Sequence, residues 1–208
     1  MNMFTTEHFI WIGLCAAFIA AMCIIAGKRK MGLKQAGGIM VFICAVSEIS
    51  KMMSGMIASP GGGMHLDPLN LPLHLCSLMI FSVLYITFAK ESGLKRLLMN
   101  FTAVMGTLGS FCAIMIPTNG TDFGDILAYQ CFVYHAGLMW FSLYLIFSGN
   151  AQIGSVRSFA ENLGLLLALA FAMLYINGAL SVYDTNFFYL TRPPMENLPY
   201  LNLERGWY

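Results

Sequence analysis

The sequence predicts an all-α fold: a polytopic transmembrane helix bundle. Of its 208 residues, 58% are hydrophobic and only 10% are charged, and its mean hydropathy is +0.71, whereas soluble domains carry about 25% charged residues. A helix needs roughly 20 apolar residues to cross a bilayer core of ~30 Å. Six predicted spans meet this requirement, at 8–26, 36–57, 71–89, 97–116, 127–147 and 159–180. The connections are too short to fold alone, so residues 1–208 are expected to form a single integral membrane domain.

The basic residues predict how the bundle is oriented. They occur in the first, third and fifth connections, as Lys28, Arg29, Lys30, Lys34, Lys90, Lys95, Arg96 and Arg157. The second and fourth connections, 59–70 and 117–126, have none. Because basic connections stay in the cytoplasm, we expect a multi-pass protein of the plasma (cytoplasmic) membrane with its N-terminus outside. No basic region precedes the first apolar run, so that run is expected to be a spanning helix and not a signal peptide. The closing "LERGWY" has the interfacial aromatic residues expected where a seventh span begins.

Several functional classes are not supported by the sequence. A net charge of +1, without a basic patch interleaved with aromatic residues, gives no reason to expect nucleic acid as a partner. The chain has no G-x-G-x-x-G after a strand, no phosphate-binding loop, no H-E-x-x-H and no C-x-x-C, so no cofactor is expected. All six cysteines fall inside predicted spans, which argues against an extracellular disulfide framework. The expected partners are membrane lipids.

Two charged residues lie inside the second predicted span. Glu48 and Lys51, in "SEISK", stand three positions apart and therefore share one face of a helix, where they can pair. An ionisable group in a span costs roughly 2.5–3.5 kcal/mol on insertion scales, so each requires a reason. One interpretation is a structural ion pair that holds this helix to its neighbours. The other is a functional site that faces a polar cavity.

Other polar residues fall at a similar depth. His74 and Cys76 begin the third predicted span, His135 lies in the outer half of the fifth, and Asn177 lies near the outer end of the sixth. The inner halves of the same helices are expected to be almost purely apolar. This asymmetry predicts a cavity that opens toward the outer leaflet or the external face.

The stretch "LPLHLCSL" (71–78) raises the question of a reactive thiol. Pro72 is typical of a first helical turn. His74 and Cys76 would point about 200° apart on a helix, so Cys76 needs a partner from another helix. By depth that partner is His135, whose imidazole could activate the thiol. Alternatively, Cys76 is a small buried hydrophobic residue. No metal is expected, because His74, His135 and a carboxylate include no closely spaced ligand pair.

Three motifs together resemble a known family. "LPLHLCSL", "YHAGLMW" and "TNFFYLTRPP" are similar to the YwaF-like integral membrane proteins of bacteria, in order and in spacing. Members of that family usually have a seventh helix after the last of these motifs. The family is distantly similar to a eukaryotic transmembrane acyltransferase that remodels ether phospholipids through a cysteine thioester.

The resemblance implies a site and a substrate class. The nucleophile maps onto Cys76 and the supporting histidine onto His135, with a phospholipid as the substrate. On this hypothesis Glu48 and Lys51 orient the lipid headgroup. The remaining expected substrate-binding residues are His74, Asn177 and Asn186.

Two alternatives come from other functional classes. In a transporter or solute-binding protein, Glu48, Lys51 and His135 would line a path for a solute or a proton. The apolar inner half and the absence of an inverted repeat argue against it. The third alternative is a membrane subunit that binds a protein partner.

Overall fold

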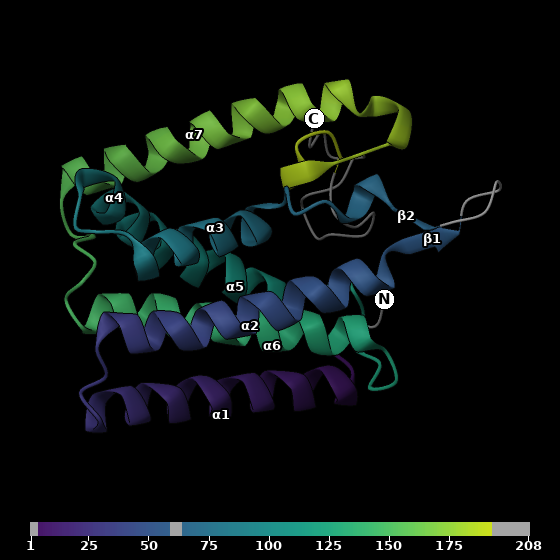
Figure 1. Cartoon of the computed structure of the whole chain (residues 1–208). Helices are drawn as coiled ribbons and strands as arrows, with labels where there is room; N and C mark the ends of the chain where they lie inside the picture. The colour runs from purple at the N-terminus through teal and green to yellow at the C-terminus, as the bar shows by residue number, and fades with distance from the viewer. Residues whose placement is uncertain (1–3, 59–63, 193–208) are drawn as a thin grey trace.

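A computed structural model describes residues 4–58 and 64–192, which form a bundle of long helices (Figure 1). The predicted all-α polytopic fold is confirmed. In chain order the helices are α1 (Thr6–Lys28), α2 (Leu33–Ser54), α3 (Leu75–Phe88), α4 (Gly93–Phe101), α5 (Thr107–Met115), α6 (Ile126–Phe147) and α7 (Val156–Ala179). A π-helical segment, η2 (Thr102–Gly106), joins α4 and α5 into one continuous span.

Five of the six predicted spans are long and apolar enough to cross a membrane: α1, α2, the α4–η2–α5 span, α6 and α7. The third is shorter than predicted, because α3 has only 14 residues and begins at Leu75. Pro72 therefore lies in a turn before the helix and not in its first turn, and Leu73 N–H donates to the Leu71 carbonyl at 2.8 Å. The predicted start of a seventh span lies outside the described residues.

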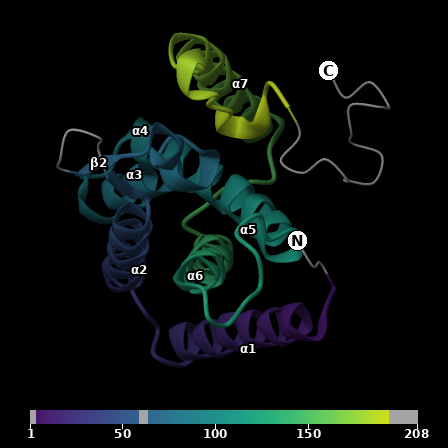
Figure 2. The ribbon, with the colours of Figure 1, turned by 90° about the vertical axis from the view of Figure 1, so that its right-hand side faces the viewer.

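The core of the bundle surrounds α6. This helix lies between α1, α2 and α5 (Figure 2), and its large residues Leu138, Trp140, Phe141 and Leu145 are almost completely buried. Helices in a bilayer gain no hydrophobic energy by associating, so they are held by close packing and by hydrogen bonds between them. α7 is peripheral: it packs mainly on α4 and exposes many of its apolar side chains, as expected for a surface that faces lipid.

Two glycines allow close helix contacts. A side chain at Gly37 would collide with Thr87, so α2 approaches α3 closely there, and one at Gly106 would collide with Ser142, where η2 meets α6. At the second contact the Ser142 hydroxyl donates to the Thr102 carbonyl at 2.9 Å. Small residues and hydroxyl-to-carbonyl bonds are the usual means of helix association in membranes.

The N-terminal helix is fixed by buried polar contacts. His8 Nε2 lies 2.8 Å from the Ile114 carbonyl on α5, and the Trp11 indole N–H donates to the Thr121 carbonyl at 3.1 Å. The Trp11 ring also stacks on Phe132 of α6, with 4.7 Å between ring centroids. α1 is therefore an integral part of the bundle.

Short elements complete the end of the bundle at which α3 begins. Strands β1 (Met56–Ala58) and β2 (Met64–Leu66) pair in an antiparallel hairpin, and three 3-10 turns follow in the chain. These turns are η1 (Pro68–Asn70), η3 (Ser181–Tyr183) and η4 (Phe187–Tyr189).

Two buried polar side chains also lie near the basic end of the bundle. Near the basic end, Asn100 is buried and its Oδ1 accepts from the Gln152 N–H at 2.7 Å. Lys95 is also buried; its Nζ donates to the Ala89 carbonyl at 3.0 Å and pairs with Glu91 at 2.8 Å. Backbone groups of the connections between helices need partners out of water, and these polar side chains supply them.

Candidate functional site

The polar residues predicted to form a site gather at one end of the bundle, opposite the basic connections. α2 ends there, while α3 and α6 begin there (Figure 1). Glu48 and Lys51 come from the last turns of α2, His74 and Cys76 from the start of α3, and His135 from the first half of α6.

Cys76 is the second residue of α3. His74 precedes the helix in an extended conformation and makes no side-chain cap to it. The N–H groups of Cys76 and Ser77 donate no hydrogen bond to other described residues. The first turn of a helix carries partial positive charge from such N–H groups, which favours an anion beside it. The short α3 therefore gives Cys76 an electrostatic setting that a helix starting at Leu71 would not provide.

Two neighbouring helices hold the start of α3. The Tyr134 hydroxyl of α6 donates to the Cys76 carbonyl at 2.5 Å. On the other side, Lys51 Nζ of α2 donates to Ser77 Oγ at 3.2 Å and pairs with Glu48 at 3.1 Å. The predicted ion pair is therefore present. Its side chains are only 15% and 17% exposed, so they lie largely within the bundle.

The hydrogen bonds of His135 define its tautomer. Nδ1 lies 2.7 Å from the Cys131 carbonyl, which can only accept, so Nδ1 carries the proton. Nε2 then holds a lone pair, and it is buried without a hydrogen-bond partner among the described residues. A histidine in this state can accept a proton at Nε2.

The structure does not join Cys76 directly to His135. No hydrogen bond connects the two side chains within the part of the chain that the structure describes. Cys131 lies beside His135, with its thiol 3.6 Å from His135 Nδ1. The catalytic roles of Cys76 and His135 stay predictions.

The segment after α7 covers the start of α3. The His74 ring packs against Phe187 and Tyr189, with centroid distances of 5.3 and 5.1 Å. Phe188 and Tyr189 both have positive φ, 61° and 53°, a conformation that bulky residues rarely adopt unless packing enforces it. Burial raises the pKa of the Tyr189 phenol, although a hydrogen bond with Thr118 partly opposes that effect.

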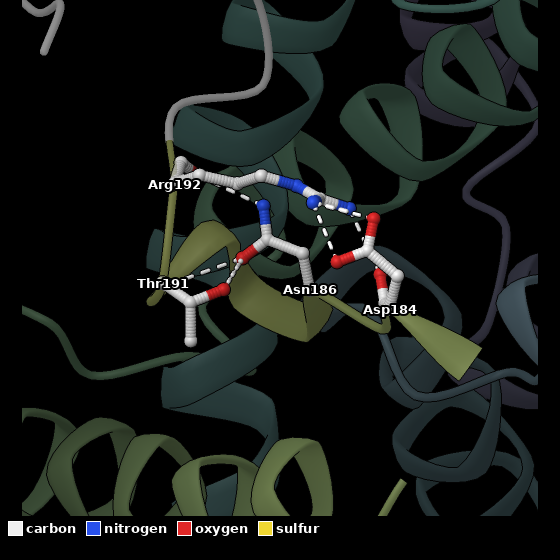
Figure 3. A network of polar contacts seen from close by, with 4 residues as sticks. All are labelled: Asp184, Asn186, Thr191 and Arg192. Carbon is white, nitrogen blue, oxygen red and sulfur yellow. Dashed lines mark hydrogen bonds and ion pairs between the residues drawn. The ribbon is translucent and has the colours of Figure 1, made fainter. Parts of the chain in front are cut away.

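Both predicted asparagines hold this segment in place. Asn177 of α7 donates from Nδ2 to the Phe187 carbonyl at 3.0 Å, and its Oδ1 accepts from the Phe187 N–H at 2.9 Å. Asn186 Oδ1 accepts from the N–H and the hydroxyl of Thr191, and its Nδ2 donates to the Arg192 carbonyl (Figure 3). Each of the two amides is thus hydrogen-bonded within the chain. Substrate binding by either asparagine stays a prediction.

An ion pair between Asp184 and Arg192 joins two ends of the same segment. The Arg192 guanidinium donates to both carboxylate oxygens of Asp184, at 2.7 and 2.6 Å, and also to the Asp184 carbonyl at 2.8 Å (Figure 3). Asp184 itself has a positive φ of 56°. The segment is thus a compact, internally bonded cap on the end of the bundle.

In a comparison with protein families, residues 3–208, nearly the whole chain, match the TMEM164 family. The chain belongs to the TMEM164 family. Neither a curated protein nor a solved structure matches it. Membership in this transmembrane family agrees with the apolar helices and shows that this is a multi-pass integral membrane protein. The YwaF-like resemblance of the three motifs stays a finer prediction.

Sequence reasoning missed three residues of the site in this TMEM164-family protein. Cys131 could have been found, because it precedes His135 by four positions and so shares its face of α6. Tyr134, the first residue of "YHAGLMW", gave no sign that its hydroxyl reaches α3. Tyr189 lies in the third motif, but only the folded cap places it against His74.

The described residues of the site bring together groups with different chemical properties. They combine a thiol in the first turn of a helix, a histidine with a free lone pair, and an ammonium group. Among the described residues of this TMEM164-family chain, no group of three or more His, Cys, Asp or Glu side chains could hold a metal ion.

Proposed function

We propose that this TMEM164-family protein is a membrane acyltransferase that moves a fatty acyl chain from one phospholipid to a lysophospholipid through a thioester on Cys76. The observation that carries the proposal is the position of Cys76 in the first turn of α3, where the N–H groups of Cys76 and Ser77 donate to no other residue that the structure describes. The similarity of "LPLHLCSL" and "YHAGLMW" to YwaF-like proteins supports the same assignment.

The helix start can stabilise both negative charges of the reaction. It stabilises the negative charge that develops on the Cys76 sulfur as its proton leaves, because a helix N-terminus favours an anion. After attack, N–H groups of the same turn can donate to the oxygen of the tetrahedral intermediate, as in other acyl-transfer enzymes. Tyr134 fixes this turn through the Cys76 carbonyl, so the donors are held in place before the substrate binds.

His135 acts as the base in this mechanism. A thiol shielded from water rests in its protonated form, so a base must take the proton as the sulfur attacks. Nε2 of His135 takes that proton once substrate binding brings the two side chains within reach of each other. The sulfur forms a bond to the acyl carbon, the ester C–O bond breaks, and the proton passes to the departing lysophospholipid oxygen.

The second half of the reaction reverses the roles. The hydroxyl of an acceptor lysophospholipid gives its proton to His135 Nε2 and attacks the thioester. A new ester bond forms, the C–S bond breaks, and the proton returns to the Cys76 sulfur. Lys51 of α2 donates to Ser77, which lies in the same turn of α3 as Cys76. Its ammonium group can bind the phosphate of the donor or the acceptor.

The test follows the acyl chain on the intact protein. The purified protein is incubated with a phospholipid that carries a labelled acyl chain, its mass is measured with and without hydroxylamine, and a lysophospholipid is then added as a chase. We expect a hydroxylamine-sensitive acyl adduct that the lysophospholipid removes, with the label appearing in a new phospholipid. Cys76→Ser should lose the adduct and the transfer, while Cys112→Ser, which removes an exposed thiol of α5, should retain both.

Three outcomes would overturn the mechanism. An adduct that the acceptor cannot remove would show a stable lipid modification and not an intermediate. Full transfer by Cys76→Ser would exclude the thioester. If Glu48→Gln or Lys51→Met altered uptake of a solute while Cys76→Ser changed nothing, the transporter hypothesis would replace the acyltransferase.

A further inference from the structure

A hollow of about 710 Å³ lies at the opposite end of the bundle from Cys76. It is formed by the turn between α1 and α2 and by the first turns of α2. Its lining residues combine two basic side chains with mainly apolar neighbours: Arg29, Met31, Lys34, Gln35, Gly38, Ile39 and Phe42. The proposed acyl transfer uses none of them.

The two basic groups of the hollow have no acidic partner among the described residues. The acidic side chains near this end are Glu91 and Glu161, and each already pairs with a cation from its own segment. Glu91 binds Lys95 at 2.8 Å, and Glu161 binds Arg157 at 2.8 Å. The positive charge at the mouth of the hollow is therefore not neutralised by the protein, so it favours an anionic ligand.

The rest of the hollow is suited to a hydrocarbon chain. Gly38 has open space where a side chain would stand, and the Phe42 ring is 69% exposed. From Lys34 to Phe42 the helix rises ~12 Å, at ~1.5 Å per residue. A ligand that is anionic at one end and apolar along this length has the form of a phospholipid.

The turn that forms the hollow is rigid. α1 ends in a Schellman arrangement, in which Lys30 N–H donates to the Gly27 carbonyl and Met31 N–H to the Ala26 carbonyl. The Tyr144 hydroxyl of α6 donates to the Met31 carbonyl at 2.9 Å, and Gln35 Oε1 accepts from the N–H of Gly32 at 3.1 Å. A ligand would therefore enter a preformed site and lose little affinity to ordering of the turn.

We infer that this hollow binds an anionic phospholipid of the inner leaflet. Its phosphate lies between Arg29 and Lys34, and one acyl chain runs along α2 from Gly38 toward Phe42. Basic connections stay on the cytoplasmic side, where anionic lipids are concentrated, and basic pockets between helices on that side are typical sites for lipid headgroups.

The experiment is native mass spectrometry of the detergent-purified protein titrated with phosphatidylglycerol, with phosphatidylcholine as the zwitterionic comparison. We expect retained phosphatidylglycerol adducts and few phosphatidylcholine adducts. Arg29→Gln combined with Lys34→Gln should weaken phosphatidylglycerol binding about 25-fold, since each basic group near an anionic lipid contributes roughly a factor of five. The control is Lys90→Gln combined with Arg96→Gln, which removes the same charge at the same end but outside the hollow, and it should bind as the unchanged protein does.

A second variant tests the acyl-chain part of the site without changing charge. Gly38→Leu fills space that is open in the structure and improves helix propensity, so the protein should fold and yet bind phosphatidylglycerol less tightly. Glycerol 3-phosphate, which has the anion but no acyl chain, should compete poorly.

Two results would overturn the inference. Equal losses in the two charge-removal variants would show attraction to net charge and not a defined site. Full competition by glycerol 3-phosphate, together with unchanged binding by Gly38→Leu, would show a site for a free phosphate compound and exclude the lipid. Neither result depends on whether Cys76 transfers acyl chains.

Discussion

The hydroxyl of Tyr134 on α6 donates a 2.5 Å hydrogen bond to the main-chain carbonyl of Cys76 on α3. This bond links the proposed nucleophile to the helix that also carries His135. The bond involves the carbonyl of Cys76 and not its thiol. In the proposed mechanism Tyr134 therefore positions the first turn of α3 and takes no part in the chemistry.

Tyr134→Phe should therefore lower the rate of Cys76 acylation by about tenfold, because the first-turn donors lose their fixed position. It should also reduce stability by about 1 kcal/mol, the usual net worth of one such bond. Tyr144→Phe is the matched control, since it removes an equivalent bond to the Met31 carbonyl at the other end of the bundle. Stopped-flow acylation and thermal unfolding in detergent measure both effects. Equal rates in the two variants would show that Tyr134 is merely structural.

His135→Ala should lower acyl transfer by about 10²–10⁴-fold, the range expected when a general base is lost. Because the reaction needs the lone pair at Nε2, added imidazole should restore part of the rate in this variant. His8→Ala provides the comparison: it also removes a buried histidine, but one that binds Ile114 through its own Nε2. That variant should lose stability without any rescue by imidazole. A His135→Ala protein with normal transfer would rule out the assigned base.

The Glu48–Lys51 pair should be more costly to break than to remove. Glu48→Gln leaves the ammonium of Lys51 largely buried without its anion, so it should destabilise the fold, by up to about 3 kcal/mol. Glu48→Gln combined with Lys51→Met removes both charges and should recover most of that loss. If Lys51 binds the lipid phosphate, the double variant should still show a raised KM for phospholipid. Thermal unfolding and steady-state kinetics together separate the two roles, and an unchanged KM would leave the pair with a structural role only.

Gly106→Ala should destabilise the bundle by about 1–3 kcal/mol, because the added methyl group meets the Ser142 hydroxyl where η2 packs on α6. Gly109→Ala, three residues later in the same span, meets no atom and should be neutral or slightly stabilising. Ser142→Ala in the Gly106→Ala background should recover part of the loss by relieving the collision. Thermal unfolding of the four proteins in one detergent checks the series. A stable Gly106→Ala protein would mean that η2 can move away from α6.

Asn177→Leu should loosen the cap over the start of α3. The change removes both hydrogen bonds to Phe187 while keeping a side chain of similar size. Limited chymotrypsin digestion should then cleave after Tyr189 faster than in the unchanged protein. The comparison is Arg192→Lys, which keeps the Tyr189 cleavage site and weakens the exposed contacts of Arg192 with Asp184, an ion pair worth less than about 1 kcal/mol and a hydrogen bond to the Asp184 carbonyl. Equal cleavage in the two variants would show that Asn177 does not hold the cap.

The candidate site shows how far local sequence patterns reach. The Glu48–Lys51 pair could be predicted, because three positions on one helix fix the distance between two side chains. The residue at which α3 begins could not be predicted in this way. Pro72 is compatible with a first helical turn, yet the chain turns at Pro72 and the helix begins at Leu75. That choice is set by contacts with other elements: His74 packs on Phe187, and Tyr134 holds the Cys76 carbonyl.

By itself, the sequence determined the membrane location, the all-α class, the number of apolar segments and the end of the bundle at which the polar residues gather. These properties depend on composition and on position along single helices. Only the tertiary structure decided what each side chain faces. It placed Cys131 beside His135, used Asn177 and Asn186 to bind backbone, and formed the hollow between Arg29 and Lys34. The physical reason is that such contacts depend on the rotation and depth of neighbouring helices, which are fixed by packing across the whole bundle and are not encoded in any one segment.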